Sequence, residues 1–152
     1  MERFRVIEAG EGIEGAILRR LTDRGGLRDQ CVSERHPALV VISPRAVRRG
    51  LELPAACRTV LLPGDAGAAL GQLRAASAVS YGNSPRDSLT LSSRNGDRLW
   101  AALQRELVTV DGHVVERQEF PLRRPPGTGD LSTLAVAGAL LLLGVPPEEL
   151  SQ

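Results

Sequence analysis

A glycine-rich loop near the beginning of the chain has the residue types and spacing of a phosphate-binding turn. Its sequence, Gly10-Glu11-Gly12-Ile13-Glu14-Gly15, has the pattern G-x-G-x-x-G. This pattern binds the pyrophosphate of a dinucleotide when it connects a strand to the first turn of a helix. Glu34 follows near the distance expected of an acid that binds the ribose. One interpretation is therefore a small Rossmann-like dinucleotide-binding protein that uses Gly10, Gly12 and Gly15.

Acidic residues around this loop favour a different interpretation. Glu8, Glu11 and Glu14 place negative charge where main-chain N–H groups would attract a pyrophosphate. The segment 29–35, where a second apolar strand is required, is polar. Carboxylates can also bind a metal ion or act as acid and base, but the helix dipole alone favours acidic residues at a helix start. We therefore expect a structural glycine turn, with dinucleotide binding as the alternative, and no cofactor or metal ion.

Other catalytic arrangements are missing from the sequence. All 19 basic residues are arginines, so the chain has no lysine and no Gly-Lys-Ser/Thr loop for the β- and γ-phosphates of ATP. Cys31 and His36 supply two metal ligands at most, and His113 has no acidic or cysteine partner at ligand spacing. No Gly-x-Ser-x-Gly nucleophile turn is present. The sequence thus favours a protein without enzymatic activity.

Composition indicates one soluble globular domain over residues 1–152, with 42% hydrophobic and 24% charged residues. A net charge of +1 gives no overall attraction to nucleic acid or to a membrane. The arginine pairs Arg19-Arg20, Arg48-Arg49 and Arg123-Arg124 can contact phosphate, but no aromatic residues are interleaved for base stacking, so we interpret them as solvated surface.

Cysteine usage and the first residues indicate the compartment. Cys31 and Cys57 do not form a disulfide framework and suit a reducing environment. The first residues, 1–4, lack the apolar segment of a signal peptide. The apolar stretch 131–145 contains two glycines and is too short to span a bilayer. We expect a cytoplasmic protein.

The first part of the chain, residues 1–82, alternates strand and helix patterns. Apolar runs predict strands at 4–9, 38–42, 59–62 and 78–81, with helices from Ile13 to about Gly25, from Pro44 to Arg49 and from Asp65 to about Ala76. A continuous apolar run is typical of a parallel strand covered on both faces. This order predicts an α/β fold with a mostly parallel sheet flanked by helices.

The second part predicts antiparallel strands, at 83–124, and a helical segment, at 130–150. Residues 88–92 alternate like a strand, and 99–110 and 113–122 form a long hairpin around Asp111-Gly112. Asp130 is an N-cap candidate for a helix over 131–143, and Gly144 suits its C′ position.

From about Arg58 onward, the order of elements resembles the central domain of the Mur ligases and folylpolyglutamate synthases. Residues 59–65 stand where that family has a strand leading to Asn-Ala-Asp-Asp, and Val79-Ser80-Tyr81-Gly82 is similar to its strand ending in Tyr-Gly. Residues 132–140 resemble its helix Asn-Ala-Leu-Ala-Ala, and 143–150 resemble its Leu-Gly-Val-Pro-x-Glu tail. The resemblance implies the α/β sheet with late antiparallel strands.

The departures from that family affect its chemistry. The ATP loop and the lysine that is carbamylated for the second metal are absent, and Thr128-Gly129 replaces the His-Asn before the late helix. The resemblance therefore implies a non-catalytic Mur-ligase-like domain, a pseudoenzyme, that acts as an interaction or regulatory module. A third possibility is that the chain complements a separate subunit that carries the nucleotide site.

The predicted hairpin is the candidate interaction surface. Val108, Val110, Val114 and Val115 put apolar side chains on both faces, so one face can pack on the core while the other stays exposed. Exposed strands of this kind bind partners by strand addition or face-to-face packing. We expect a protein partner or a homodimer, with no nucleic acid and no membrane.

Overall fold

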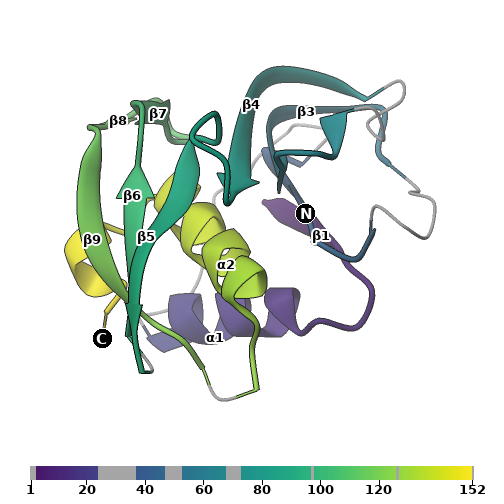
Figure 1. Ribbon diagram of the computed structural model, residues 1–152. Coiled ribbons are helices and arrows are strands. Elements are labelled where there is room, and N and C mark those ends of the chain that lie inside the picture. The colour runs from purple at the N-terminus through teal and green to yellow at the C-terminus, as the bar shows by residue number, and fades with distance from the viewer. Residues whose placement is uncertain are drawn as a thin grey trace.

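The computed structural model describes residues 3–23, 37–46, 53–67, 73–96, 98–125 and 127–151. These residues form an α/β fold with a mostly parallel seven-stranded sheet in the order β1-β2-β3-β4-β5-β6-β9 and a two-stranded sheet, β7-β8 (Figure 1). The strands are β1 (Phe4–Ile7), β2 (Leu39–Ile42), β3 (Ala56–Pro63), β4 (Arg74–Gly82), β5 (Leu89–Asn95), β6 (Arg98–Leu103), β7 (Leu107–Val108), β8 (Val114–Val115) and β9 (Gln118–Arg123). The helical elements are α1 (Ile13–Asp23), α2 (Asp130–Leu142) and the short 3-10 turn η3 (Pro147–Glu149).

The parallel part of the sheet consists of β1 to β4. Val6 pairs with Val41 of β2, and Val41 pairs with Leu61 of β3. All four residues of β2 are buried, as the continuous apolar run predicts for a strand covered on both faces. The predicted α/β class and its mostly parallel sheet are therefore confirmed.

A short step joins the parallel part to the antiparallel part. β4 and β5 run parallel but share only the pairs Tyr81–Leu89 and Gly82–Thr90. β5 then pairs antiparallel with β6, and β6 with β9. Residues 83–88 thus connect β4 to β5, which lies next to β4 at its carboxyl end and begins the antiparallel half of the same sheet.

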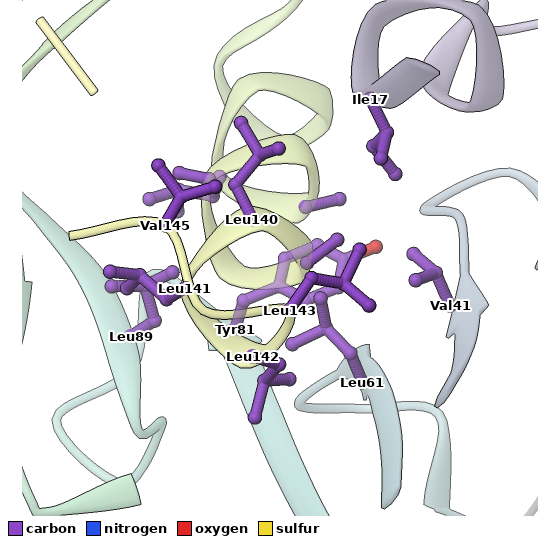
Figure 2. Packing of buried hydrophobic residues seen from close by; sticks show 14 of the residues in the cluster. Ile17, Val41, Leu61, Tyr81, Leu89, Leu140, Leu141, Leu142, Leu143 and Val145 are labelled. Atoms are coloured by element: carbon purple, nitrogen blue, oxygen red, sulfur yellow. The ribbon is translucent and has the colours of Figure 1, made fainter. Parts of the chain in front are cut away.

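Helices α1 and α2 contact each other, and α2 packs against strands of both halves of the sheet. In Figure 1 α2 lies between the antiparallel strands on one side and the parallel strands on the other. Figure 2 shows its last turn surrounded by Leu61, Tyr81 and Leu89, all fully or nearly fully buried. A second apolar cluster, which includes Val40 and Cys57, packs on the other face of the parallel strands.

The ends of α2 differ in how they match the sequence prediction. Gly129 is the N-cap, without a side-chain cap. Asp130 instead forms ion pairs with Arg94 at 2.9 Å and Arg124 at 3.1 Å, so its prediction as the N-cap is wrong. At the other end the φ of Gly144 is 101°, and the N–H of Val145 donates to the Leu140 carbonyl at 2.9 Å. This is a Schellman motif, and the predicted C′ position of Gly144 is confirmed.

Two predicted elements are corrected. Residues 74–76, predicted to end a helix, begin β4, because their main chain pairs with β3 from Ala56 onward. The long hairpin is divided: β6 and β9 pair up to Leu103–Gln118, whereas β7 and β8 form a separate ladder that pairs Leu107 with Val115. The turn at Asp111-Gly112 is present, with a φ of 89° at Gly112. In the described ranges, no helix has both the length and the apolar composition needed to cross a membrane.

Candidate functional site

The glycine loop connects β1 to α1 at the carboxyl end of the parallel strands, where ligands bind in open α/β sheets. Gly10 and Gly12 have φ values of 78° and 75°, which explains why glycine stands at both positions. Gly15 is the third residue of α1, and a Cβ added there would meet nothing within 4 Å. The strand–turn–helix context is therefore present, but Gly15 lacks the close helix–strand packing that the third glycine of a dinucleotide fingerprint provides.

The Glu8 carboxylate occupies the amino end of α1. Its two oxygens accept hydrogen bonds from the main-chain N–H groups of Ile13 and Glu14, each at 2.9 Å. These N–H groups are the ones that would face a phosphate at a helix start. The chain's own carboxylate thus satisfies the donors and the positive end of the helix dipole.

Glu11 joins the loop to the end of β2. Its Oε1 accepts the N–H of Ala9 at 3.1 Å and the hydroxyl of Ser43, and its Oε2 accepts the N–H of Arg45 at 3.3 Å. Ser43 is fully buried, and its Oγ accepts the N–H of Ala46 at 3.1 Å. Glu11 therefore works as a structural bridge. Across the described segments, no three His, Cys, Asp or Glu side chains gather as a metal site would require.

Tyr81, at the carboxyl end of β4, is a buried group that was not singled out from the sequence as a site residue. Tyr81 is fully buried, and its hydroxyl donates to the Ile42 carbonyl at 2.6 Å. Burial raises the pKa of Tyr81 well above its ordinary value, and the negative charges of Glu11 and Asp65 raise it further. The phenol thus remains protonated and serves as a hydrogen-bond donor. Cys57 is also buried, which raises its pKa and keeps it in the unreactive thiol form.

Asp87 is another buried group that was not singled out from the sequence, with 4% of its surface exposed. Its Oδ2 accepts the N–H of Ser84 at 3.1 Å. An added Cβ would lie 1.9 Å from its Oδ1 at Gly64 and 2.5 Å from its Oδ2 at Gly82. The ends of β3 and β4 therefore need glycine for Asp87 to fit between them, a constraint that single sequence patterns do not reveal.

A pocket of about 320 Å³ lies where α1, α2 and the end of β9 meet. Arg19 and Arg20 of α1 and Arg123 of β9 line it. The sequence marked these arginines as pairs that can contact phosphate, but nothing in it indicated that the fold brings Arg123 to α1. Their convergence follows only from tertiary packing.

The predicted interaction residues divide between surface and interior. Val108 and Val114 are 49% and 57% exposed and are cross-strand partners. Val115 is half-buried, and Val110 is 3% exposed, so it belongs to the core. The carbonyl of Val110 accepts a hydrogen bond from Arg58 at 2.5 Å, and its N–H donates to Leu142 at 2.9 Å. Several other candidates lie outside the described residues: Cys31, Glu34, His36 and Arg48-Arg49.

Comparison of the sequence with protein-family models and with curated proteins finds no match.

Proposed function

We propose that this chain is a non-catalytic domain on a Mur-ligase-like scaffold that acts as a protein-interaction or regulatory module. The observation that carries the proposal is the position of the Glu8 carboxylate on the first N–H groups of α1. A phosphate at that position would have to displace a bonded anion that is covalently part of the chain. The resemblance rests on the order of elements from about Arg58 onward. There β3, β4 and β5 pair in parallel and β6 and β9 follow in antiparallel pairs, which is consistent with such a scaffold.

The alternative function, dinucleotide binding by Gly10, Gly12 and Gly15, has weaker support. The loop geometry favours it, but Glu8 and Glu11 occupy the donors that a pyrophosphate needs. Two carboxylates at 4–6 Å from a phosphate would repel it by a few kcal/mol at an effective dielectric constant of about 20. That repulsion is comparable to the favourable interaction of a phosphate with the positive end of the helix dipole.

The exposed face of the β7-β8 ladder is the contact surface in this proposal. Val108 and Val114 lie side by side across the two strands, and both are about half exposed. The turn that carries them is fixed from several sides: Arg3 binds both carboxylate oxygens of Asp111 at 2.5 Å, and Arg58 binds the carbonyl of Val110. A fixed apolar pair loses little conformational entropy on association, which suits a docking surface.

Association can be tested with the double variant Val108→Glu and Val114→Glu. Two carboxylates at the centre of an apolar contact should weaken self-association or partner binding at least tenfold, because burying unpaired charge costs several kcal/mol. Light scattering at tens of micromolar protein and pull-down from the native host measure the effect. His113→Glu, an exposed change on the same turn, is the matched control and should leave association unchanged. A monomeric wild type that recovers no partner would contradict the proposed contact.

The non-catalytic assignment has its own test. Isothermal titration of the wild type with ATP–Mg²⁺, and separately with NAD, should give no heat of specific binding at micromolar concentrations. A Kd in the low micromolar range for ATP would contradict the loss of the nucleotide site. The same result for NAD, lost in Gly12→Val, would favour the dinucleotide alternative.

A further inference from the structure

The pocket between α1, α2 and β9 has a wall of aliphatic side chains and a cationic rim. Its volume of about 320 Å³ is at the lower end of the range for small-molecule sites. The aliphatic wall comes from both helices, the end of β9 and the residue after η3. It comprises Ala16, Leu122, Val136, Ala137, Leu140 and Leu150.

The three guanidinium groups at the rim differ in what they already bind. Arg20 donates to the main-chain carbonyl of Glu149 at 2.7 Å, which holds it against the wall. In the part of the chain that the structure describes, Arg19 and Arg123 form no ion pair with a carboxylate. Glu11 is the carboxylate that lines this pocket among the described residues, and its oxygens already accept three donors. Among the described residues, Arg19 and Arg123 therefore give the rim positive charge and N–H donors that no carboxylate binds.

The threonine hydroxyl groups at the pocket, and the lack of aromatic side chains among its described lining residues, limit the class of ligand that fits. Thr128 and Thr133 also line the pocket; the Thr133 hydroxyl donates to the Gly129 carbonyl at 2.9 Å, and its oxygen can still accept. Within the described ranges, none of the lining residues is aromatic, so these residues offer a nucleobase no ring to stack on. An aliphatic body fits this wall better than a nucleotide does.

We propose that this pocket binds a small amphipathic anion, a carboxylate or phosphate monoester with a short aliphatic tail. Arg19 and Arg123 contact the anionic head, since the planar guanidinium group matches carboxylate and phosphate oxygens in paired hydrogen bonds. Arg20, held by the carbonyl of Glu149, lies on the same side of the pocket. The tail lies against Ala16 and Val136, where its burial is favourable. This site is separate from the β7-β8 surface and does not depend on it.

The test uses octanoate and octyl phosphate as probes, with octanol and inorganic phosphate as the separated halves. Isothermal titration should give a Kd of tens to hundreds of micromolar for at least one anion, as expected for ligands of about ten non-hydrogen atoms. The preferred head group distinguishes a carboxylate from a phosphate ligand. Octanol and inorganic phosphate should each bind at least tenfold more weakly.

Variants locate the binding in the pocket. Arg19→Ala combined with Arg123→Ala should weaken the anion at least tenfold, whereas Arg117→Ala, an exposed arginine on the loop after β8, should not. Ala16→Trp should fill the pocket and abolish binding, with circular dichroism confirming the fold. If neither anion binds at millimolar concentration, if octanol or phosphate binds equally well, or if the two arginine variants behave alike, the proposal is overturned. The arginine variants replace exposed side chains, so they remain informative even if Ala16→Trp does not fold.

Discussion

Replacing Glu8 with alanine removes both acceptors that the first turn of α1 uses for the N–H groups of Ile13 and Glu14. If Glu8 occupies the anion position of the loop, this variant should lose stability and acquire an anion site at the same time. Glu8→Gln keeps one amide oxygen as an acceptor but removes the charge, so its loss should be smaller.

The size of the loss follows from the contacts. Removal of a helix cap costs about 0.5–2 kcal/mol, and hydrogen bonds to a charged group contribute about 1.5–3 kcal/mol before solvent competes. The Glu8 side chain is half-buried and water replaces part of its role, so we expect a loss of about 1–2 kcal/mol for Glu8→Ala. For a chain of this length that corresponds to a fall in Tm of roughly 2–8 °C.

Thermal melts with and without sulfate provide the assay. Sulfate stabilises folded proteins generally, so the informative quantity is the difference between the variant and the wild type. In Glu8→Ala the freed N–H groups can bind the anion. At a sulfate concentration of about ten times its Kd, this binding should raise the unfolding free energy of the variant by roughly 1.4 kcal/mol more than that of the wild type. Glu14→Ala removes a carboxylate from the same turn without removing a cap and should change stability by about 0.5 kcal/mol at most.

Two results would refute the reasoning about Glu8. One is a Glu8→Ala melting temperature within about 1 °C of the wild type, which is below the expected fall of roughly 2–8 °C. The other is an equal sulfate response in both proteins, since that would mean that the carboxylate does not compete with anions for the start of α1.

Two further predictions concern the buried edge of the sheet. Gly64→Ala places a Cβ 1.9 Å from Asp87 Oδ1 and should lower the unfolding free energy by at least about 2 kcal/mol. Urea denaturation measures this loss. Gly67→Ala is the control, because its Cβ meets nothing within 4 Å, and its unfolding free energy should stay close to that of the wild type. Because burial raises the pKa of Tyr81, the only tyrosine, its absorbance at 295 nm should stay constant to pH 11 in the folded protein but rise near pH 10 in urea. Above pH 10 the unfolded state releases this proton first, so stability should fall by about 1.4 kcal/mol per pH unit through this group. Tyr81→Phe should remove that slope; an equally steep fall in the variant, or a folded-state titration near pH 10, would contradict the assignment.

Patterns dominated by local chemistry were predictable from the sequence. The buried run Leu39–Ile42 is a parallel strand because both of its faces are covered, and Gly144 ends α2 because its φ of 101° suits glycine. The carboxylates around the glycine loop were interpreted as repelling phosphate. The structure adds that Glu8 caps α1, because its carboxylate accepts the N–H groups of Ile13 and Glu14. The sequence alone does not show that this side chain contacts the start of the helix.

What the sequence missed depends on contacts between distant segments. Residues 74–76 have helix-favouring alanines, but the ladder with β3 decides their conformation, since tertiary pairing overrides weak local propensity. The arginine pocket joins α1 to β9 across most of the chain, and no spacing rule connects them. Val110 was grouped with its exposed neighbours because alternation breaks down where β7 ends and the turn begins.

The narrow junction between β4 and β5 has a consequence for how the molecule opens. Among the described residues, Tyr81–Leu89 and Gly82–Thr90 are the two pairs that connect the parallel and antiparallel halves through the sheet. Main-chain hydrogen bonds between these strands alone would therefore let the two halves separate as independent units. Helix α2 prevents this, because it packs against β2, β3, β4 and β5 at once. Amides of β2 and of β6 should therefore exchange with solvent through a shared opening event in which α2 leaves the sheet, and the helix, rather than the sheet, makes the unfolding of the two halves cooperative.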